Sequence, residues 1–451
     1  MLEKKKIMWL LWLIGSVAMV CWFAVPLVKK EGQGMYLIGG TTHGHHQIEM
    51  QCAACHTSPF GGGEVLQEAC VDCHGDELKV ANDSHPKSKF TDPRNADRID
   101  ILDARYCVTC HREHKKEITG EMGLTLPKDY CFGCHENVAE KRETHKGLAF
   151  DSCASSGCHN YHDNRALYED FLLKHAVGDV LKDKAERLRL NGLENFLANR
   201  DAPQQVSALM DAPEEYNNDP AVEEWQLSSH PSAGVACRSC HQDGSTGDWH
   251  EKPNAMICGT CHQSQMSGFL AGKHGMRLKA GLSAMTPAMA RIAMKDSASH
   301  LALSCTSCHS PHDVNQQSAG FEACVGCHDS SHVNNFANSP HAGLMEQARR
   351  GEIPDTQSVD CATCHLPREI IEEAGEKIVR VNHNQNDNLR PNQKMIRTVC
   401  LDCHSLAFAI DSLADPALIQ SNFSGLPTSH VRSIDMAVER DEKANQREKV
   451  F

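Results

Sequence analysis

Cysteine pairs that close directly onto a histidine are the residues of this chain best suited to do chemistry, and they use 22 of its 23 cysteines. Ten of the eleven pairs read Cys-x-x-Cys-His, and the eleventh is stretched to Cys-x4-Cys-His. The regular pairs are Cys52 and Cys55, Cys70 and Cys73, Cys107 and Cys110, Cys131 and Cys134, Cys237 and Cys240, Cys258 and Cys261, Cys305 and Cys308, Cys324 and Cys327, Cys361 and Cys364, and Cys400 and Cys403. The histidines that follow them are His56, His74, His111, His135, His241, His262, His309, His328, His365 and His404. The stretched motif consists of Cys153, Cys158 and His159.

This spacing predicts covalent haem attachment. Two thiols form thioether bonds to the vinyl groups of a porphyrin, and the adjoining imidazole becomes the proximal ligand of the iron. A structural zinc site needs four ligands in another arrangement, and a redox dithiol needs no adjoining histidine. A disulfide framework does not place a histidine after every second cysteine. The sequence therefore predicts eleven covalently attached haem c groups.

The stretched pair has two interpretations. Cys153 and Cys158 either carry a haem through a longer loop or form a disulfide beside His159, and the surrounding motifs favour the haem. Cys21 is a separate case, because it lies in an apolar leader and is expected to act as a small hydrophobic residue.

Histidines outside the motifs are candidates for the second ligand of each iron. The chain has 28 histidines, so the eleven proximal ones leave 17 others, enough for eleven bis-histidine haems. A histidine that follows a proximal ligand by three residues reaches a neighbouring haem more easily than its own, which would hold haems in close pairs. The candidates are His46, His85, His114, His145, His162, His175, His230, His250, His274, His312, His332, His341, His383 and His430. For any single candidate, an ordinary surface histidine is the alternative.

An apolar segment near the N-terminus predicts how the chain is exported. Residues 7–28 follow three lysines and are long enough to cross a bilayer as a helix. No Ala-x-Ala-like site follows, so we expect an uncleaved signal anchor, with a cleaved signal peptide of atypical site as the alternative. Haem c is attached outside the bacterial inner membrane, so the bulk of the chain is expected in the periplasm.

Composition narrows the class of partner and of fold. The formal net charge is −14, and no basic stripe alternates with aromatic residues, so nucleic-acid binding is not expected. An acidic surface instead favours encounters with basic patches of redox partner proteins. Only 5% of the residues are aromatic, so we expect the porphyrins to form much of the core. The predicted fold is mainly α-helical, with extensive loops wrapped around the haems.

The motifs fall into two groups that predict two multihaem modules, five motifs before residue 160 and six after residue 236. Helical stretches are expected at 164–199 and 263–303, a linker at 201–220, and a helical tail that frays from Glu439. The predicted domains are an anchor at 1–34, a five-haem module at 35–165, a helical segment and linker at 166–220, a six-haem module at 221–438 and a charged tail at 439–451.

The first module resembles the small multihaem cytochromes of the c3/c7 type. The likeness rests on Gly44-His45-His46 before the first motif, on His85 in Asp-Ser-His-Pro, and on Cys107-x-x-Cys-His-x-x-His114. The stretched motif at Cys153 also occurs among c3-type cytochromes.

The second module resembles the octahaem hydroxylamine oxidoreductase-like family. The matching segments are Trp225-x3-Ser-His230, Cys258-Gly-Thr-Cys-His, Phe269-Leu-Ala-Gly-Lys-His274, Cys305-Thr-Ser-Cys-His-x-x-His312, Ala323-Cys-Val-Gly-Cys-His-x3-His332, Ser339-Pro-His341, Asn382-His383 and Lys394-Met-Ile. The resemblance implies an active haem near the Gly-Lys-His segment and a tyrosine bonded to it. This chain has no haem motif between His274 and Cys305, and its last tyrosine is Tyr216. Oxidation of hydroxylamine is therefore not expected.

Two functions remain from different classes. The first is a membrane-anchored periplasmic carrier that passes electrons between a membrane or quinol-linked donor and periplasmic redox partners. The alternative is a terminal reductase of nitrite, hydroxylamine, tetrathionate or sulfite at one five-coordinate haem. That enzyme would need cationic donors for the developing anion. Lys273 and Arg277 beside His274 are the candidates, and the favoured alternative is that they are ordinary solvated charges. A haem-storage scaffold would explain the cofactors but not the paired histidines.

Overall fold

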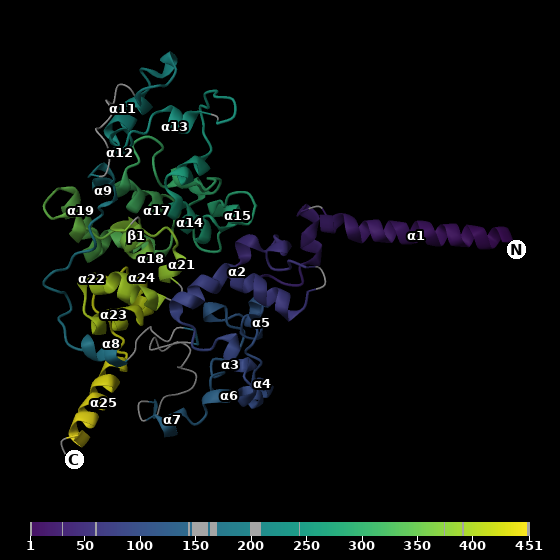
Figure 1. The fold of residues 1–451 in the computed structure, drawn as a ribbon, viewed down its shortest axis with the longest axis horizontal. Coiled ribbons are helices and arrows are strands. Elements are labelled where there is room, and N and C mark those ends of the chain that lie inside the picture. The colour runs from purple at the N-terminus through teal and green to yellow at the C-terminus, as the bar shows by residue number, and fades with distance from the viewer. Residues whose placement is uncertain are drawn as a thin grey trace. The chain divides into compact units, whose positions relative to one another are not determined.

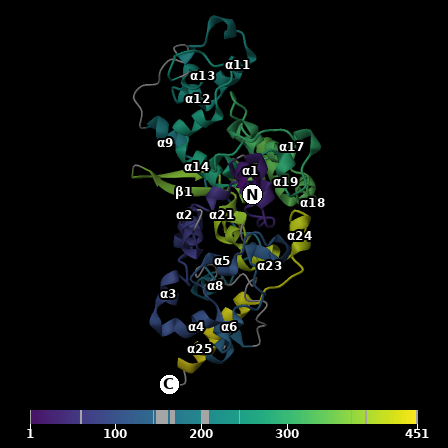
Figure 2. The same cartoon turned by 90° about the vertical axis from the view of Figure 1, so that its right-hand side faces the viewer.

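The structure is a computed structural model that describes residues 2–28, 30–58, 61–142, 145–146, 161–162, 169–198, 209–242, 244–373, 375–389 and 392–448. As predicted, the described chain is mainly helical, and its regular sheet is a single hairpin (Figures 1 and 2). It divides into two compact units, Met1–Glu77 with Pro86–Pro127, and Leu78–His85 with Lys128–Phe451. The domain boundaries expected from the sequence stay predictions.

The first unit contains the apolar helix expected at the N-terminus. Within α1, the segment Lys4–Pro26 has a mean hydropathy of 2.1 and none of it is buried, so by length and composition it could span a membrane. The helices of this unit are α1 (Leu2–Val28), α2 (Gly63–Ala81, whose last residues belong to the second unit), α3 (Lys87–Thr91), α4 (Ala96–Ile101) and α5 (Cys107–Cys110).

The second unit is built from many short helices joined by loops. They are α6 (Phe132–His135), α7 (Val138–Lys141), α8 (Glu169–Lys174), α9 (Gly192–Ala198), α11 (Pro220–Leu227), α12 (Ser229–Ser232), α13 (Arg238–His241), α14 (Gln263–Ala271), α15 (Met276–Lys279), α16 (Gln316–Gly320), α17 (Glu322–Cys327), α18 (Ser331–Asn335), α19 (Pro340–Arg349), α20 (Cys361–His365), α21 (Asn386–Leu389), α22 (Leu401–Cys403), α23 (Leu406–Leu413), α24 (Pro416–Gln420) and α25 (Ser433–Glu448). A π-helical turn, η17 (Ile396–Cys400), leads into α22.

One β-hairpin, which the sequence analysis did not predict, follows the motif in α20. Strand β1 (Arg368–Glu373) pairs antiparallel with β2 (Glu376–Val381), with Arg368 opposite Val381 and Glu373 opposite Glu376 (Figure 2). Gly375 in the connection has a φ of +83°, a conformation that glycine adopts without a steric penalty.

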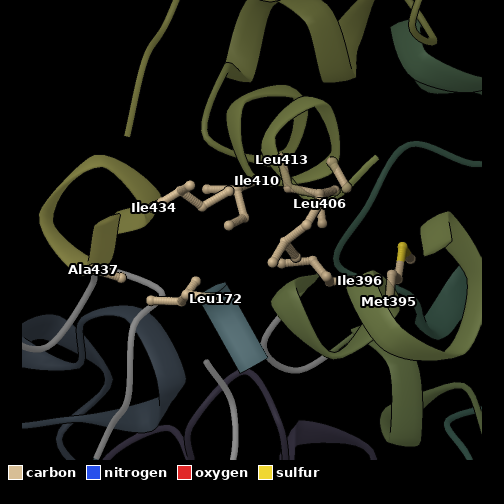
Figure 3. Packing of buried hydrophobic residues seen from close by; sticks show 9 residues of the cluster. Leu172, Met395, Ile396, Leu406, Ile410, Leu413, Ile434 and Ala437 are labelled. Carbon is tan, nitrogen blue, oxygen red and sulfur yellow. The ribbon is translucent and has the colours of Figure 1, made fainter. Parts of the chain in front are cut away.

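The largest apolar core lies at the C-terminal end of the second unit (Figure 3). It joins side chains of α8, η17, α23 and α25, and Ile396 and Leu406 at its centre are each only 1% exposed. The nine buried members are Leu172, Met395, Ile396, Leu406, Ala409, Ile410, Leu413, Ile434 and Ala437. The expectation that porphyrins form most of the remaining core stays a prediction.

The helix expected at 164–199 is replaced, where the chain is described, by the short helices α8 and α9 with an extended segment between them. The backbone N–H of Lys182 donates to the carbonyl oxygen of Cys403, 2.8 Å away. That of Arg187 donates to the carbonyl oxygen of Thr356, 2.9 Å away. These bonds to distant parts of the chain hold the segment extended, so tertiary contacts override its helical propensity.

The helix expected at 263–303 is interrupted as well. It is helical through α14 and α15, but residues 280–303 form loops and short 3₁₀ turns. Gly281 has a φ of +70°, which ends the helical run, and Pro287 has no backbone N–H to continue one.

The C-terminal tail is more helical than the sequence predicted. Helix α25 continues to Glu448, so the segment from Glu439, which was expected to fray, is helical up to that residue. An ion pair of 3.0 Å between Arg432 and Glu439 ties the charged part of the helix to its first turn.

Candidate functional site

Each regular motif folds as one tight turn of backbone. In eight of the ten, the backbone N–H of the histidine donates to the carbonyl oxygen of the first cysteine at 2.8–3.0 Å. The other two motifs lie inside α2 and α20. Residues three and four apart in such a turn lie on one face, so both thiols and the imidazole are presented to the same side. This is the local arrangement that attachment of one haem requires.

Among the described residues, none of the twenty motif cysteines forms a disulfide. Burial raises the pKa of Cys308 to about 11 and the pKa values of Cys364 and Cys400 to about 12. These thiols are therefore protonated at neutral pH, unlike the low-pKa thiols of redox-active dithiols. Within the described residues no group of three or more His, Cys, Asp and Glu side chains is arranged to hold a bare metal ion.

Eight motif histidines each lie opposite a histidine from outside the motifs. The ring centroids of every pair are 5.8–6.3 Å apart. The pair of the first unit is His45 with His74 at 5.8 Å. The pairs of the second unit, with the motif histidine second, are His85 and His135, His230 and His262, His312 and His241, His274 and His328, His383 and His309, His332 and His365, and His341 and His404.

The separation within these pairs fits two imidazoles on opposite sides of one iron. A bond between a metal and an imidazole nitrogen is about 2 Å long, and the ring centroid lies roughly 1 Å behind the nitrogen, so the two centroids are expected about 6 Å apart. All eight separations fall at that value, and each pair combines one motif histidine with one other. The described residues therefore fit bis-histidine haem at these eight motifs.

Burial keeps several of these imidazoles neutral, as metal ligation requires. It lowers the pKa of His274, His341 and His365 to about 4, because the protonated ring loses its hydration inside the protein. Neighbouring imidazoles lower these pKa values further. At neutral pH the rings are uncharged.

Backbone carbonyl groups orient the rings through the nitrogen that faces away from the partner histidine. A carbonyl oxygen only accepts, so Nδ1 carries the proton and Nε2 is the unprotonated nitrogen that can ligate a metal. Such bonds join Nδ1 of His85 to Tyr161 O at 2.7 Å, His241 to His250 O at 2.7 Å, His404 to Val180 O at 2.8 Å, His383 to Val381 O at 3.0 Å and His332 to Ile419 O at 2.5 Å. At His332 the side-chain amide of Asn422 also lies 3.4 Å from Nε2.

His45 in the first unit is oriented differently, by a carboxylate. Its Nδ1 lies 2.6 Å from Oε1 of Glu113, and the other oxygen of that carboxylate accepts from the Thr42 backbone N–H at 2.7 Å. Burial alone raises the pKa of Glu113, but the bonds from His45 and Thr42 outweigh it, so the pKa lies below its ordinary value. Sequence reasoning passed over His45 for His46, its neighbour. The spacing of Thr42, His45 and Glu113 gives no signal along the chain, because the three meet only in the fold.

The remaining predicted distal ligands differ in what their ring nitrogens contact. Nδ1 of His114 donates to Gly39 O at 3.0 Å and that of His46 to His43 O at 2.9 Å, so Nδ1 carries the proton in both rings. Both ring nitrogens of His430 face carboxylates, so iron ligation would require one of those contacts to open. The ligand roles of His46, His114, His145, His162, His175, His250 and His430 stay predictions, and the motif of Cys153, Cys158 and His159 lies outside the described residues.

Successive motifs adjoin one another within each unit. The thiols of Cys258 and Cys305 are in hydrogen-bonding contact, which lowers the pKa of the first and raises that of the second. Contact with the thiol of Cys361, followed by burial, raises the pKa of Cys324. Burial first, and then the thiols of the adjoining motif, raise the pKa values of Cys240, Cys308 and Cys364. The last six motifs of the chain, from Cys237 to Cys403, therefore form an unbroken succession. The first three motifs of the chain are linked in the same way, through Cys55 with Cys73 and Cys70 with Cys107.

Lys273 and Arg277, the cationic side chains that a reductase would need, lie close in sequence to a histidine that already faces a motif histidine. Arg277 donates from Nε to the carbonyl oxygen of Ser283 at 3.0 Å. His274, beside Lys273, lies opposite His328. The arrangement at this point of the chain therefore fits a two-histidine centre.

Residues 44–136 match the family model described as cytochrome c3. This confirms the c3-type part of the resemblance and gives this region covalently bound haem c and electron transfer as its chemistry. No curated protein and no solved structure matches the chain. The likeness of the second module to octahaem oxidoreductases rests on its sequence segments and stays a prediction.

Proposed function

We propose that this chain is a membrane-anchored, periplasmic c-type cytochrome with eleven haems. It passes electrons between a membrane or quinol-linked donor and periplasmic redox partners. The cytochrome c3-like region supplies the class of protein. The apolar helix α1 supports the membrane anchor, and the net charge of −14 supports docking to basic patches of partner proteins.

The observation that carries this proposal is the unbroken succession of the last six motifs, from Cys237 to Cys403. Haem iron, when bound, takes up and releases one electron at a time. The residues of this chain hold each motif beside the next, from Cys240 with Cys258 to Cys364 with Cys400. A row of adjoining centres provides a path, whereas an isolated catalytic centre would not need one.

The histidine pairs support a carrier over a reductase. A metal held by two protein imidazoles has no open position for a substrate, and its surroundings change little when its charge changes. Burial of His274, His341 and His365 fixes these rings in place. The chain therefore favours fast exchange of electrons over binding of an oxyanion.

The electronic spectrum of the purified, full-length protein tests the proposal. A carrier gives a wholly low-spin spectrum that does not respond to nitrite, hydroxylamine, tetrathionate or sulfite. A high-spin signal that shifts on addition of any of these would overturn the pure-carrier function and favour the reductase. Membrane fractionation of the full chain, compared with a variant in which a cleavable signal peptide replaces residues 1–30, tests the anchor separately, because that variant is still exported.

A further inference from the structure

The histidine pair of the second motif is bonded to carboxylates on both sides. His45 and His74 lie opposite one another, and Nδ1 of His45 is 2.6 Å from Oε1 of Glu113. On the other side, Nδ1 of His74 is 3.4 Å from Oε2 of Glu77. The five pairs with bonds to backbone carbonyls have a neutral acceptor in that place.

The Glu113 carboxylate is fixed where it stands. The backbone N–H of Thr42 donates to Oε2 at 2.7 Å and its hydroxyl donates to Oε1 at 2.9 Å. Thr42 is 5% exposed, and the side chain of Glu113 is 26% exposed. Glu77 is 42% exposed and lies at the limit of hydrogen-bonding distance, so its effect on His74 is the weaker one.

A carboxylate acceptor changes an imidazole ligand more than a carbonyl does. Charge-assisted hydrogen bonds are roughly twice as strong as neutral ones. A carboxylate at Nδ1 draws the proton away and makes the ligating nitrogen more basic. A more basic ligand stabilises the oxidised, more positive iron, so the reduction potential of that haem falls.

We propose that Glu113 is a positioning residue that sets the reduction potential of the haem attached at Cys70 and Cys73 below those of the haems whose histidines are bonded to carbonyls. The inference rests on the proposed function, since it assumes haem at this motif. It places a low-potential step in the part of the chain nearest the apolar helix in sequence. This haem would therefore be reduced only transiently while electrons pass through it.

Spectropotentiometry of the full-length protein tests this assignment. In Glu113→Gln the amide is neutral, so we expect one component of the titration to move to higher potential. A roughly tenfold change in its reduction equilibrium corresponds to about 59 mV. The His45→Met variant identifies that component, because it replaces a ligand of the same iron. Electron paramagnetic resonance of Glu113→Gln should show one altered low-spin signal.

A second variant has the opposite expected sign. Thr42→Val keeps the shape of the side chain but removes the hydroxyl that shares Oε1 of Glu113. The carboxylate then accepts more strongly from His45, and the same component is expected to move to lower potential. Glu117→Gln is the matched control, because it removes an equal charge from an exposed position of the same unit and is expected to leave the component unchanged.

Three outcomes would overturn the inference. They are no shift in Glu113→Gln, a shift of equal size in Glu117→Gln, and shifts of the same sign in Glu113→Gln and Thr42→Val. Mass spectrometry of the peptide that carries Cys70 and Cys73 separates this failure from that of the proposed function. A peptide without haem would sink both, whereas a haem-bearing peptide with an unmoved potential would sink the Glu113 inference alone.

Discussion

The imidazole rings of His341 and His404 lie opposite one another, with centroids 6.2 Å apart and planes at 65°. His341 comes from the first turn of α19, and His404 follows α22 at the end of the last motif. Burial lowers the pKa of His341 to about 4, so the ring is neutral when it faces its partner. Both rings are half-buried, and their separation fits two ligands of one iron.

Replacing His341 removes the second ligand of this pair. In His341→Ala we expect the haem to stay attached, because both thioethers and His404 remain, and to become high-spin. A haem count by pyridine haemochrome should equal that of the wild type, while electron paramagnetic resonance gains one high-spin signal. His300→Ala is the control, since His300 is exposed and outside the predicted ligands. A wholly low-spin His341→Ala protein would show that His341 is not a ligand.

Counting the haems attached to the chain tests whether the stretched motif carries one. If Cys153 and Cys158 carry a haem, the double variant Cys153→Ser, Cys158→Ser has an intact mass lower by one haem, and the wild type carries eleven. Cys21→Ser, outside every motif, should leave the haem count unchanged. If the two cysteines form a disulfide instead, the double variant keeps the haem count of the wild type.

The C-terminal core predicts a large loss of stability from a single truncation. Leu406 is 1% exposed and packs within the nine-residue cluster of Figure 3. Leu406→Ala is expected to reduce the free energy of unfolding by roughly 2–5 kcal/mol, through lost burial and the cavity it leaves. Chemical denaturation followed by circular dichroism measures the change. Val177→Ala, at a side chain that is 97% exposed, should change it by less than about 0.5 kcal/mol.

The low pKa of the Asp415 carboxyl predicts how the stability of the fold depends on pH. Hydrogen bonds from the backbone and hydroxyl of Thr428, and then from the backbone of Leu418 and Ala417, hold the pKa of its carboxyl at about 2. The folded pKa is below the ordinary value of about 3.9, so the carboxylate stabilises the fold above that value. This stabilisation is lost as the pH falls through about 2.

The test compares melting temperatures across that range. Asp415→Asn should melt below the wild type at neutral pH, and the gap should narrow as the pH falls from about 4 to about 2. Asp296→Asn, an exposed carboxylate of the same unit, should show no such convergence. A gap that stays constant down to the lowest pH would mean that the charge of Asp415 is not what stabilises the fold.

The sequence identified most of the candidate site because its chemistry is local. A motif of five residues closes its own turn, as the bond from His111 N–H to the Cys107 carbonyl shows. Ser-His-Pro and Ser-Pro-His contexts pointed to His85, His230 and His341, each of which lies opposite a motif histidine in the structure. Their ligand roles still await the spectroscopic tests.

What the sequence did not predict depends on contacts between distant residues. The choice of His45 over its neighbour is made by Glu113, which only the folded chain brings near. The segment between α8 and α9 has helical composition, yet Lys182 bonds to Cys403 instead of to its own turn. The hairpin was foreseeable in part, because each strand has adjacent β-branched residues, Ile370 and Ile371 in β1 and Ile378 and Val379 in β2. The charged residues around them obscured the strand pattern.

The histidine pairs also impose an order of assembly. At six of the eight pairs the non-motif histidine precedes its partner in the chain, so a polypeptide exported N-terminus first offers that imidazole before the motif emerges. In the other two pairs the motif histidine comes first: His241 precedes His312, and His309 precedes His383. At those two motifs the haem lacks its second imidazole until the later histidine has crossed the membrane, whereas at the other six pairs that imidazole has already been exported when the motif emerges.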